Sequence, residues 1–204
     1  MTTYVIFGAT YAFACAVQPG PFLAYLIAQA LAHGWRRTLP MAFAPLLSDG
    51  PVILLTLLVL SQIPDWLAPA LRLAGGGFLL YLAYGAWQTW RTYDPARLAE
   101  TASSRQGVLK AATVNLLNPG PYLGWSLVMG PLLLRGWRET PAHGIALLAG
   151  FYGVMVLSLM GVIILFATAR RLGPQVNRLL VGLSALALAV FGGYQLWAGL
   201  MAFL

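Results

Sequence analysis

Gln18-Pro19-Gly20-Pro21 and Asn118-Pro119-Gly120-Pro121 each interrupt a long apolar stretch of the chain, one hundred positions apart. Because proline lacks an N–H group and breaks the hydrogen-bond ladder of a helix, backbone groups are left unpaired at both places. At membrane depth such groups are tolerated only where they line a cavity inside the protein. Paired breaks at matching places in two halves indicate the central binding site of a transporter.

The composition indicates a chain that lies almost entirely in apolar surroundings. Its 204 residues are 60% hydrophobic and 8% charged, which is typical of a polytopic membrane protein. A helical span needs about 20 apolar residues, and six stretches qualify: roughly 4–32, 39–61, 66–90, 108–134, 142–168 and 178–203. The polar stretch after the third predicts a linker, 93–107, between a first half, 1–92, and a second half, 108–204, of one membrane domain.

The basic residues predict an orientation. The first, third and fifth loops carry nine lysines and arginines, whereas the loops on the opposite side carry three. By the positive-inside rule, the linker 93–107 and the turn at Arg170-Arg171 are cytoplasmic and both termini lie outside. A re-entrant first segment would instead place the N-terminus in the cytoplasm. Since the net charge of +7 is scattered, with no dense basic arm, nucleic acid is not an expected partner.

An internal repeat relates the two halves. Besides the two breaks, Gly34-Trp35-Arg36 matches Gly136-Trp137-Arg138, and Tyr84–Trp90 matches Phe191–Trp197 in its order of aromatic, glycine and glutamine residues. With three spans per half, the second half enters the membrane from the opposite side, which makes the repeats inverted. The expected fold is therefore an all-α membrane protein of six transmembrane helices in two inverted three-helix repeats, each with a broken first helix.

Glycines that would let these helices approach closely recur in the third, fifth and sixth spans. They are Gly75, Gly76, Gly77, Gly150, Gly153, Gly161, Gly192 and Gly193.

Asp49 is the one acidic residue well inside a predicted span. Placing a carboxylate there costs ~3 kcal/mol on insertion scales, and such residues usually face a bundle interior and mark an ion or substrate path. Its counterpart in the second half is approximately Gly150, so the acid breaks the repeat symmetry. Two structural interpretations stay open: a helix cap beside Gly50-Pro51, or a buried hydrogen-bond acceptor.

The broken helices predict complementary binding chemistry. A half-helix that starts at a break presents N–H groups suited to a carboxylate, and one that ends there presents carbonyl groups suited to an ammonium group or cation. A zwitterion fits both, which indicates amino-acid-like solutes. Gln18, Asn115 and Asn118 would add neutral donors and acceptors, although capping of the helix ends is an alternative for Gln18 and Asn118.

Other kinds of chemistry find little support in the sequence. Cys15 is the only cysteine, and neither His33 nor His143 has a partner at metal-ligand spacing, so no metal site or cofactor is expected. No convincing catalytic triad, phosphate loop or zinc-protease motif is present, which argues against an enzyme.

At its breaks the chain resembles the LysE-type (RhtB-like) family of amino-acid exporters, over almost its full length. The matching segments are Pro19-Gly20-Pro21, Gly34, Asp49, Leu73-Ala74-Gly75, Leu80-Tyr81-Leu82-Ala83 and Asn115-Leu116-Leu117-Asn118-Pro119. The resemblance implies a six-helix protein of the bacterial inner membrane that exports amino acids or related small solutes, driven by the proton gradient. The chain departs from the family at Gly120, where many members have a lysine.

The leading hypothesis is a secondary exporter that works by alternating access, with Asp49 as the site of the proton or of the substrate's amine. The residues expected to bind or gate the substrate are Gln18, Pro19, Gly20, Pro21, Asp49, Asn115, Asn118, Pro119, Gly120 and Pro121. Two alternatives are an ion channel or cation exporter, and a noncatalytic membrane assembly or lipid-interacting protein. The expected partners are a small amino-acid-like solute and the lipid bilayer, and a homo-oligomer is left open.

Overall fold

The computed structural model describes residues 1–58, 66–92, 104–169 and 173–202, and every regular element in these ranges is a helix. In chain order they are α1 (Thr2–Val17), α2 (Pro21–His33), α3 (Trp35–Thr38), η1 (Leu39–Phe43), α4 (Ala44–Leu58), α5 (Leu67–Arg91), α7 (Ser104–Leu116), α8 (Pro119–Gly124), η2 (Trp125–Met129), α9 (Gly130–Glu139), α10 (Pro141–Thr168) and α11 (Pro174–Met201). α8, η2 and α9 follow one another without a break, and η2 has π-helical hydrogen bonding.

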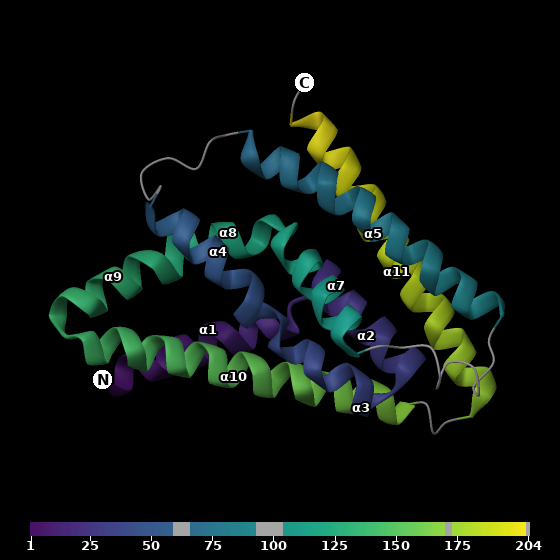
Figure 1. Cartoon of the computed structure of the whole chain (residues 1–204), viewed down its shortest axis with the longest axis horizontal. Coiled ribbons are helices and arrows are strands. Elements are labelled where there is room, and N and C mark those ends of the chain that lie inside the picture. The colour runs from purple at the N-terminus through teal and green to yellow at the C-terminus, as the bar shows by residue number, and fades with distance from the viewer. Residues whose placement is uncertain (59–65, 93–103, 170–172, 203–204) are drawn as a thin grey trace.

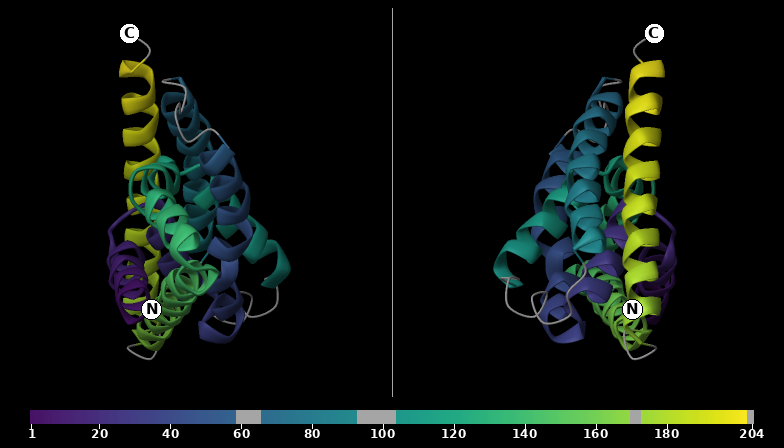
Figure 2. Two further views of the ribbon diagram at one scale, coloured as in Figure 1. Left: turned by 90° about the vertical axis from the view of Figure 1, so that its left-hand side faces the viewer. Right: turned by 90° about the vertical axis from the view of Figure 1, so that its right-hand side faces the viewer.

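The helices pack mainly in pairs that join the two halves of the chain. α5 lies beside α11, α1 lies along α10, and α4 packs against α7 (Figure 1). The side views of Figure 2 show α11 and α5 running together as one long pair, with the other helices gathered beside it. Contacts between distant parts of the sequence therefore hold the fold together.

Part of the predicted membrane topology is visible in the structure. Three helical stretches are long and apolar enough to span a membrane: Trp35–Thr56, Pro141–Thr168 and Pro174–Met201. The bent pair α1–α2 adds a fourth if it counts as one span. α5 is 25 residues long but less apolar, since it carries Arg72, Gln88 and Arg91. The structure thus supports a helical membrane protein, and the count of six spans stays a prediction.

The first helix of the second half starts earlier than the predicted span 108–134. α7 begins at Ser104, inside the predicted linker 93–107, because this polar stretch already continues into a helix. Residues 93–103 of that linker and the Arg170-Arg171 turn lie outside the described ranges.

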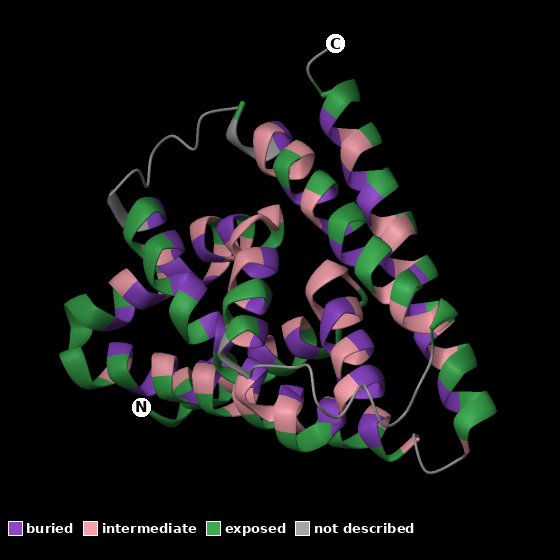
Figure 3. Ribbon diagram, turned by 45° about the vertical axis from the view of Figure 1, so that its right-hand side comes forward, coloured by how far each residue is buried: buried purple, intermediate pink, exposed green. Residues whose placement is uncertain are grey.

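Apolar side chains cover the outside of the molecule as well as its interior. On α10, Leu157 and Leu165 are exposed while Leu147, Leu159 and Ile163 are buried. Figure 3 shows buried and exposed positions following one another along the same helices. Lipid tails are as apolar as leucine, so leucines on the outside of a membrane helix can remain exposed to lipid without a free-energy cost.

The predicted close packing at glycines holds at some positions only. A Cβ atom on Gly150 would lie 2.5 Å from the Val5 carbonyl oxygen, and one on Gly76 would lie 2.9 Å from the Gly192 carbonyl oxygen. By contrast, a Cβ atom would meet nothing within 4 Å at Gly77, Gly153, Gly161 or Gly193. Glycine is thus required where α1 meets α10 and where α5 meets α11.

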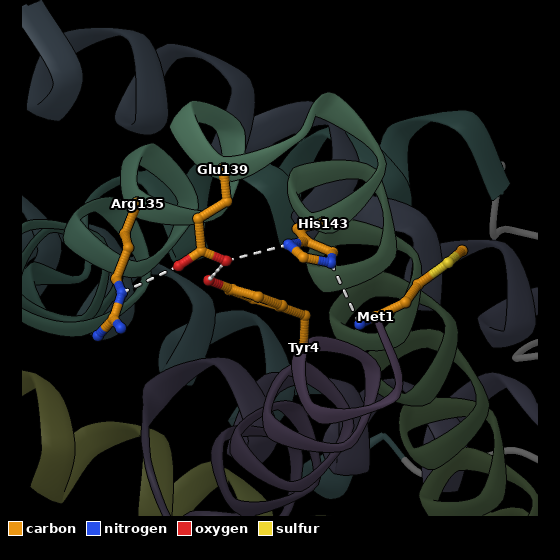
Figure 4. A network of polar contacts seen from close by, with 5 residues as sticks. All are labelled: Met1, Tyr4, Arg135, Glu139 and His143. Carbon is orange, nitrogen blue, oxygen red and sulfur yellow. Dashed lines mark hydrogen bonds and ion pairs between the residues drawn. The ribbon is translucent and has the colours of Figure 1, made fainter.

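A polar network fastens the start of α1 to the α9–α10 corner (Figure 4). The Tyr4 hydroxyl donates to Glu139 Oε2 at 3.0 Å, Arg135 Nε donates to Glu139 Oε1 at 3.3 Å, and His143 Nδ1 lies 3.1 Å from Glu139 Oε2. The N-terminal amine lies 3.2 Å from His143 Nε2. The hydrogen bond from Tyr4, with those from His143 and Arg135, holds the pKa of Glu139 below its ordinary value.

Candidate functional site

The first break separates α1 from α2 with a bend of 66°. Gln18 has an extended backbone, with φ −63° and ψ 125°, and α2 starts at Pro21. Proline suits the first position of a helix, because the N–H that it lacks would have no helical partner there. The last carbonyl groups of α1 and the first N–H groups of α2 are both left without helical partners at this point.

The second break separates α7 from α8 at Asn118, whose backbone is also extended, with φ −83° and ψ 124°. Its side-chain Oδ1 accepts a hydrogen bond from the Gly120 N–H at 3.1 Å. Asn118 therefore caps α8, as the alternative interpretation of this residue expects. This cap occupies one of the N–H groups at the second break.

One cavity of about 240 Å³ lies between the two breaks. Nine of the ten predicted site residues line it: Gln18, Pro19, Gly20, Pro21, Asp49, Asn115, Asn118, Gly120 and Pro121. The tenth, Pro119, is not among the lining residues. Segments one hundred positions apart are thus brought to a common space by the pairing of the two halves.

Asp49 lies on α4 at the wall of this cavity and is only 3% exposed. Asn115 Nδ2 donates to Asp49 Oδ1 at 2.9 Å and to Ser48 Oγ at 2.8 Å. The Tyr152 hydroxyl donates to Asp49 Oδ2 at 3.4 Å, and the Trp125 side chain lies beside the carboxylate. Side chains from α7, η2 and α10 therefore converge on one acid, which offsets part of its burial cost.

Aromatic residues that the sequence analysis does not single out complete the wall. Tyr11, Trp125 and Phe151 line the cavity, and the Trp125 and Phe151 rings meet edge to face with centroids 5.5 Å apart. A sequence signal exists for two of them. Tyr11 is seven residues before Gln18, and Trp125 is seven after Asn118. Seven residues are two helical turns, so each shares a face with its break.

Trp125 also begins the π-helical segment η2, which ends at Met129, another residue of the cavity wall. Short π-helical segments inside helices are frequent at functional sites, because the extra residue per turn rotates side chains out of the regular pattern.

Asp49 is the only carboxylate in the described lining of the cavity, and no lysine, arginine or histidine accompanies it there. Neutral amides, a few backbone groups and aromatic rings make up the rest of the binding surface. Such a surface can hold a small amine-bearing solute at the carboxylate, with an aromatic wall beside the positive charge.

A cavity between two broken helices of a membrane protein is typical of solute transporters. A model of the LysE type translocator family matches residues 13–199, and the chain belongs to this family. Its members are transporters, so the protein is a membrane transporter and not an enzyme. Neither the curated proteins nor the solved structures contain a match to the chain.

Proposed function

We propose that this protein is a secondary exporter of amino acids or related small zwitterionic solutes, in the bacterial inner membrane. The observation that carries the proposal is the shared cavity, where both breaks meet Asp49 and its partner Asn115. Membership of the LysE type translocator family supports a membrane transport function for small solutes.

The charge of the cavity favours a solute with an ammonium group. Asp49 is a lone carboxylate in the described lining, so it is the natural partner of a positive charge. The carbonyl ends of α1 and α7 add negative partial charge at the same place. Tyr11, Trp125 and Phe151 offer ring faces to the same cation.

A carboxylate on the solute would bind at the start of α2. The first N–H groups of a helix have no helical partners, and Phe22 and Leu23, which follow Pro21, line the cavity. At the second break, the Gly120 N–H is already bound by Asn118, and Gly120 brings no positive charge where many family members have a lysine. The first break is therefore the better carboxylate site in this chain.

The cavity is small. Its volume is about 240 Å³. This is below the ~300–1,000 Å³ of pockets for drug-sized ligands. This size favours a single amino acid over a peptide as the solute.

Proton coupling follows from the use of one carboxylate for two purposes. An ionised Asp49 binds the solute's ammonium group, whereas a protonated Asp49 has no charge to offer it. If the two occupants exclude each other, export of the solute is linked to entry of a proton by alternating access. We assign this exchange to Asp49.

The inverted six-helix repeat is part of the same proposal. It pairs α1–α2 with α7–α9, α4 with α10, and α5 with α11. Under such a relation, the contact of α1 with α10 has the contact of α7 with α4 as its counterpart, and both contacts occur. α5 packs against its own counterpart, α11.

The test is an efflux and tolerance screen in bacterial cells that express the chain, against cells with the empty vector. Cells loaded with dipeptides of single amino acids should show faster efflux and better growth for one or a few amino acids, and a protonophore should abolish the gain. A gain for metal cations with none for any amine-bearing solute would instead identify a cation exporter. Efflux that persists with the protonophore would contradict proton coupling.

A further inference from the structure

A second cavity, of about 370 Å³, lies apart from the candidate transport site and shares no lining residue with it. Three basic residues line it: His33 at the end of α2, Arg37 on α3 and Lys110 on α7. No aspartate or glutamate occurs among its described lining residues. Arg37 and Lys110 therefore give the cavity a positive charge that no carboxylate in its described lining balances.

Arg37 points most clearly to a missing anion. Its Nη1 atom is buried and has no hydrogen-bond partner among the described residues. Leaving a buried donor of a charged group unpaired costs free energy, which a bound anion would recover. The Lys110 ammonium group lies 6.0 Å from the centre of the Tyr81 ring, inside the same cavity, and so is held by a ring face.

Neutral donors surround the basic residues. Gln29, Gln88, Gln106 and Thr89 line the same cavity. Amide and hydroxyl groups beside cations can bind the several oxygen atoms of a phosphate.

The residues around this basic cavity are typical of the membrane interface, where lipid headgroups lie. The Arg91 guanidinium lies over the Trp87 ring, and the Arg178 guanidinium lies over the Trp90 ring. Arginine and tryptophan are residues of the membrane interface, and the basic loops are those that the sequence assigns to the cytoplasm.

An apolar groove begins where the basic cavity ends. The groove has a volume of about 460 Å³, lies between α5 and α11, and shares Tyr84 with the cavity. Trp87, Leu183 and Leu186 line it and are exposed on the outer surface. A polar anion site joined to an exposed apolar groove has the two parts that a phospholipid needs.

We propose that the basic cavity binds the phosphate group of an anionic phospholipid, whose acyl chain lies in the groove between α5 and α11. Basic pockets between membrane helices on the cytoplasmic side are suited to such headgroups. The site is separate from the transport cavity and does not depend on the proposed function.

The test measures lipid binding to the full-length protein by native mass spectrometry and by melting temperature. The probe is phosphatidylglycerol, and phosphatidylcholine with the same acyl chains is the uncharged comparison. The proposal predicts that phosphatidylglycerol binds more tightly and raises the melting temperature more. Arg37→Gln and Lys110→Gln should each weaken its binding by at least about fivefold, as expected for the loss of ~1 kcal/mol per basic residue.

Arg36→Gln is the matched control, because it removes the same charge from the residue before Arg37, which does not line the cavity. It should leave binding within about twofold of wild type. Equal losses for Arg36→Gln, or equal binding of both lipids, would overturn the proposal. If Arg37→Gln does not fold, Lys110→Gln alone decides. Glycerol phosphate at the same concentration should not match the lipid; if it does, the cavity is a site for soluble anions and the lipid assignment is wrong.

Discussion

At the scale of single residues, the chemistry centres on Asp49. Asp49 is 3% exposed, and its carboxylate accepts hydrogen bonds from Asn115 and Tyr152. These contacts also fit the structural interpretation, in which the acid only holds three helices together. The two interpretations differ in whether the charge itself is needed.

Asp49→Asn separates them. The amide keeps the size of the side chain and can still hydrogen-bond, but it cannot take up a proton or pair with an ammonium group. We expect efflux to fall at least about tenfold, the equivalent of ~1.4 kcal/mol in the transition state, while the melting temperature in detergent stays near that of wild type. Efflux assays beside thermal unfolding measure both quantities.

Ser48→Ala is the control for this change. Ser48 neighbours Asp49 and shares the Asn115 donor, but it carries no charge. It should retain most of the efflux. Normal export by a well-folded Asp49→Asn protein would contradict the role assigned to the carboxylate, and equal losses in both variants would indicate a structural network.

Glu139, the last residue of α9, predicts that the stability of the protein depends on pH. Hydrogen bonds lower the pKa of Glu139 in the folded protein, so its contribution to stability is complete above its ordinary value of 4.5. The contribution is lost as the pH falls through the lowered folded pKa. Because Glu139 is exposed, the effect is expected to be small.

Glu139→Gln should therefore narrow the fall in melting temperature between neutral and strongly acidic pH. Comparison with wild type over the same pH range isolates this residue from the other acids. A wild-type and a variant curve that stay parallel at all pH values would refute the linkage.

Some site residues can be identified from the sequence around them, and others cannot. Gln18 and Asn118 are found from sequence because proline and glycine break a helix wherever they stand, and Asp49 because a charge in an apolar span is conspicuous. Tyr152 cannot be identified in this way, because nothing near it in the sequence indicates that it contacts Asp49. The contact exists only through the packing of α4 with helices of the other half.

At the scale of elements, the same limit applies to the glycines. All eight are alike in sequence, yet Gly150 touches the Val5 backbone while Gly153, one turn further along α10, faces open space. Which face of a membrane helix meets its neighbour cannot be predicted from hydrophobicity, because lipid and protein interior are equally apolar. Span limits are uncertain for a related reason, as the early start of α7 illustrates.

Gly150→Ala should separate α1 from α10. The new methyl group would lie 2.5 Å from the Val5 carbonyl oxygen, and backbone cannot yield as a flexible side chain would. We expect a loss of roughly 1–3 kcal/mol, as for overpacked cores. Thermal unfolding in detergent measures it.

Gly153→Ala is the matched control on the same helix, since its Cβ atom would meet nothing within 4 Å. It should be neutral or slightly stabilising, because alanine favours helices over glycine by about 0.5–1 kcal/mol. Similar losses at both positions would show that the α1–α10 contact is not where the structure places it.

At the scale of the whole molecule, the orientation in the membrane remains a prediction from the basic loops. In a Cys15→Ser background, Ser103→Cys should react with an impermeant thiol reagent only in inverted vesicles, and Leu204→Cys in intact cells. The reverse labelling pattern would indicate the opposite orientation, in which the basic cavity faces the outside.

Alternating access makes one further demand, that the shared cavity open in turn to each side of the membrane. The protein contains its own probe for this, because Cys15 is the only cysteine and lines the cavity beside the first break. No new cysteine has to be introduced, and the wild-type protein can be used.

The most direct measurement is the rate at which Cys15 is alkylated by an impermeant reagent, from each side of the membrane, with and without the amino acid identified by the efflux screen. We predict that Cys15 reacts from both sides and that the exported solute slows the reaction in wild type but not in Asp49→Asn. A rate that the solute leaves unchanged in wild type, or a Cys15 that reacts from one side under every condition, would contradict the account.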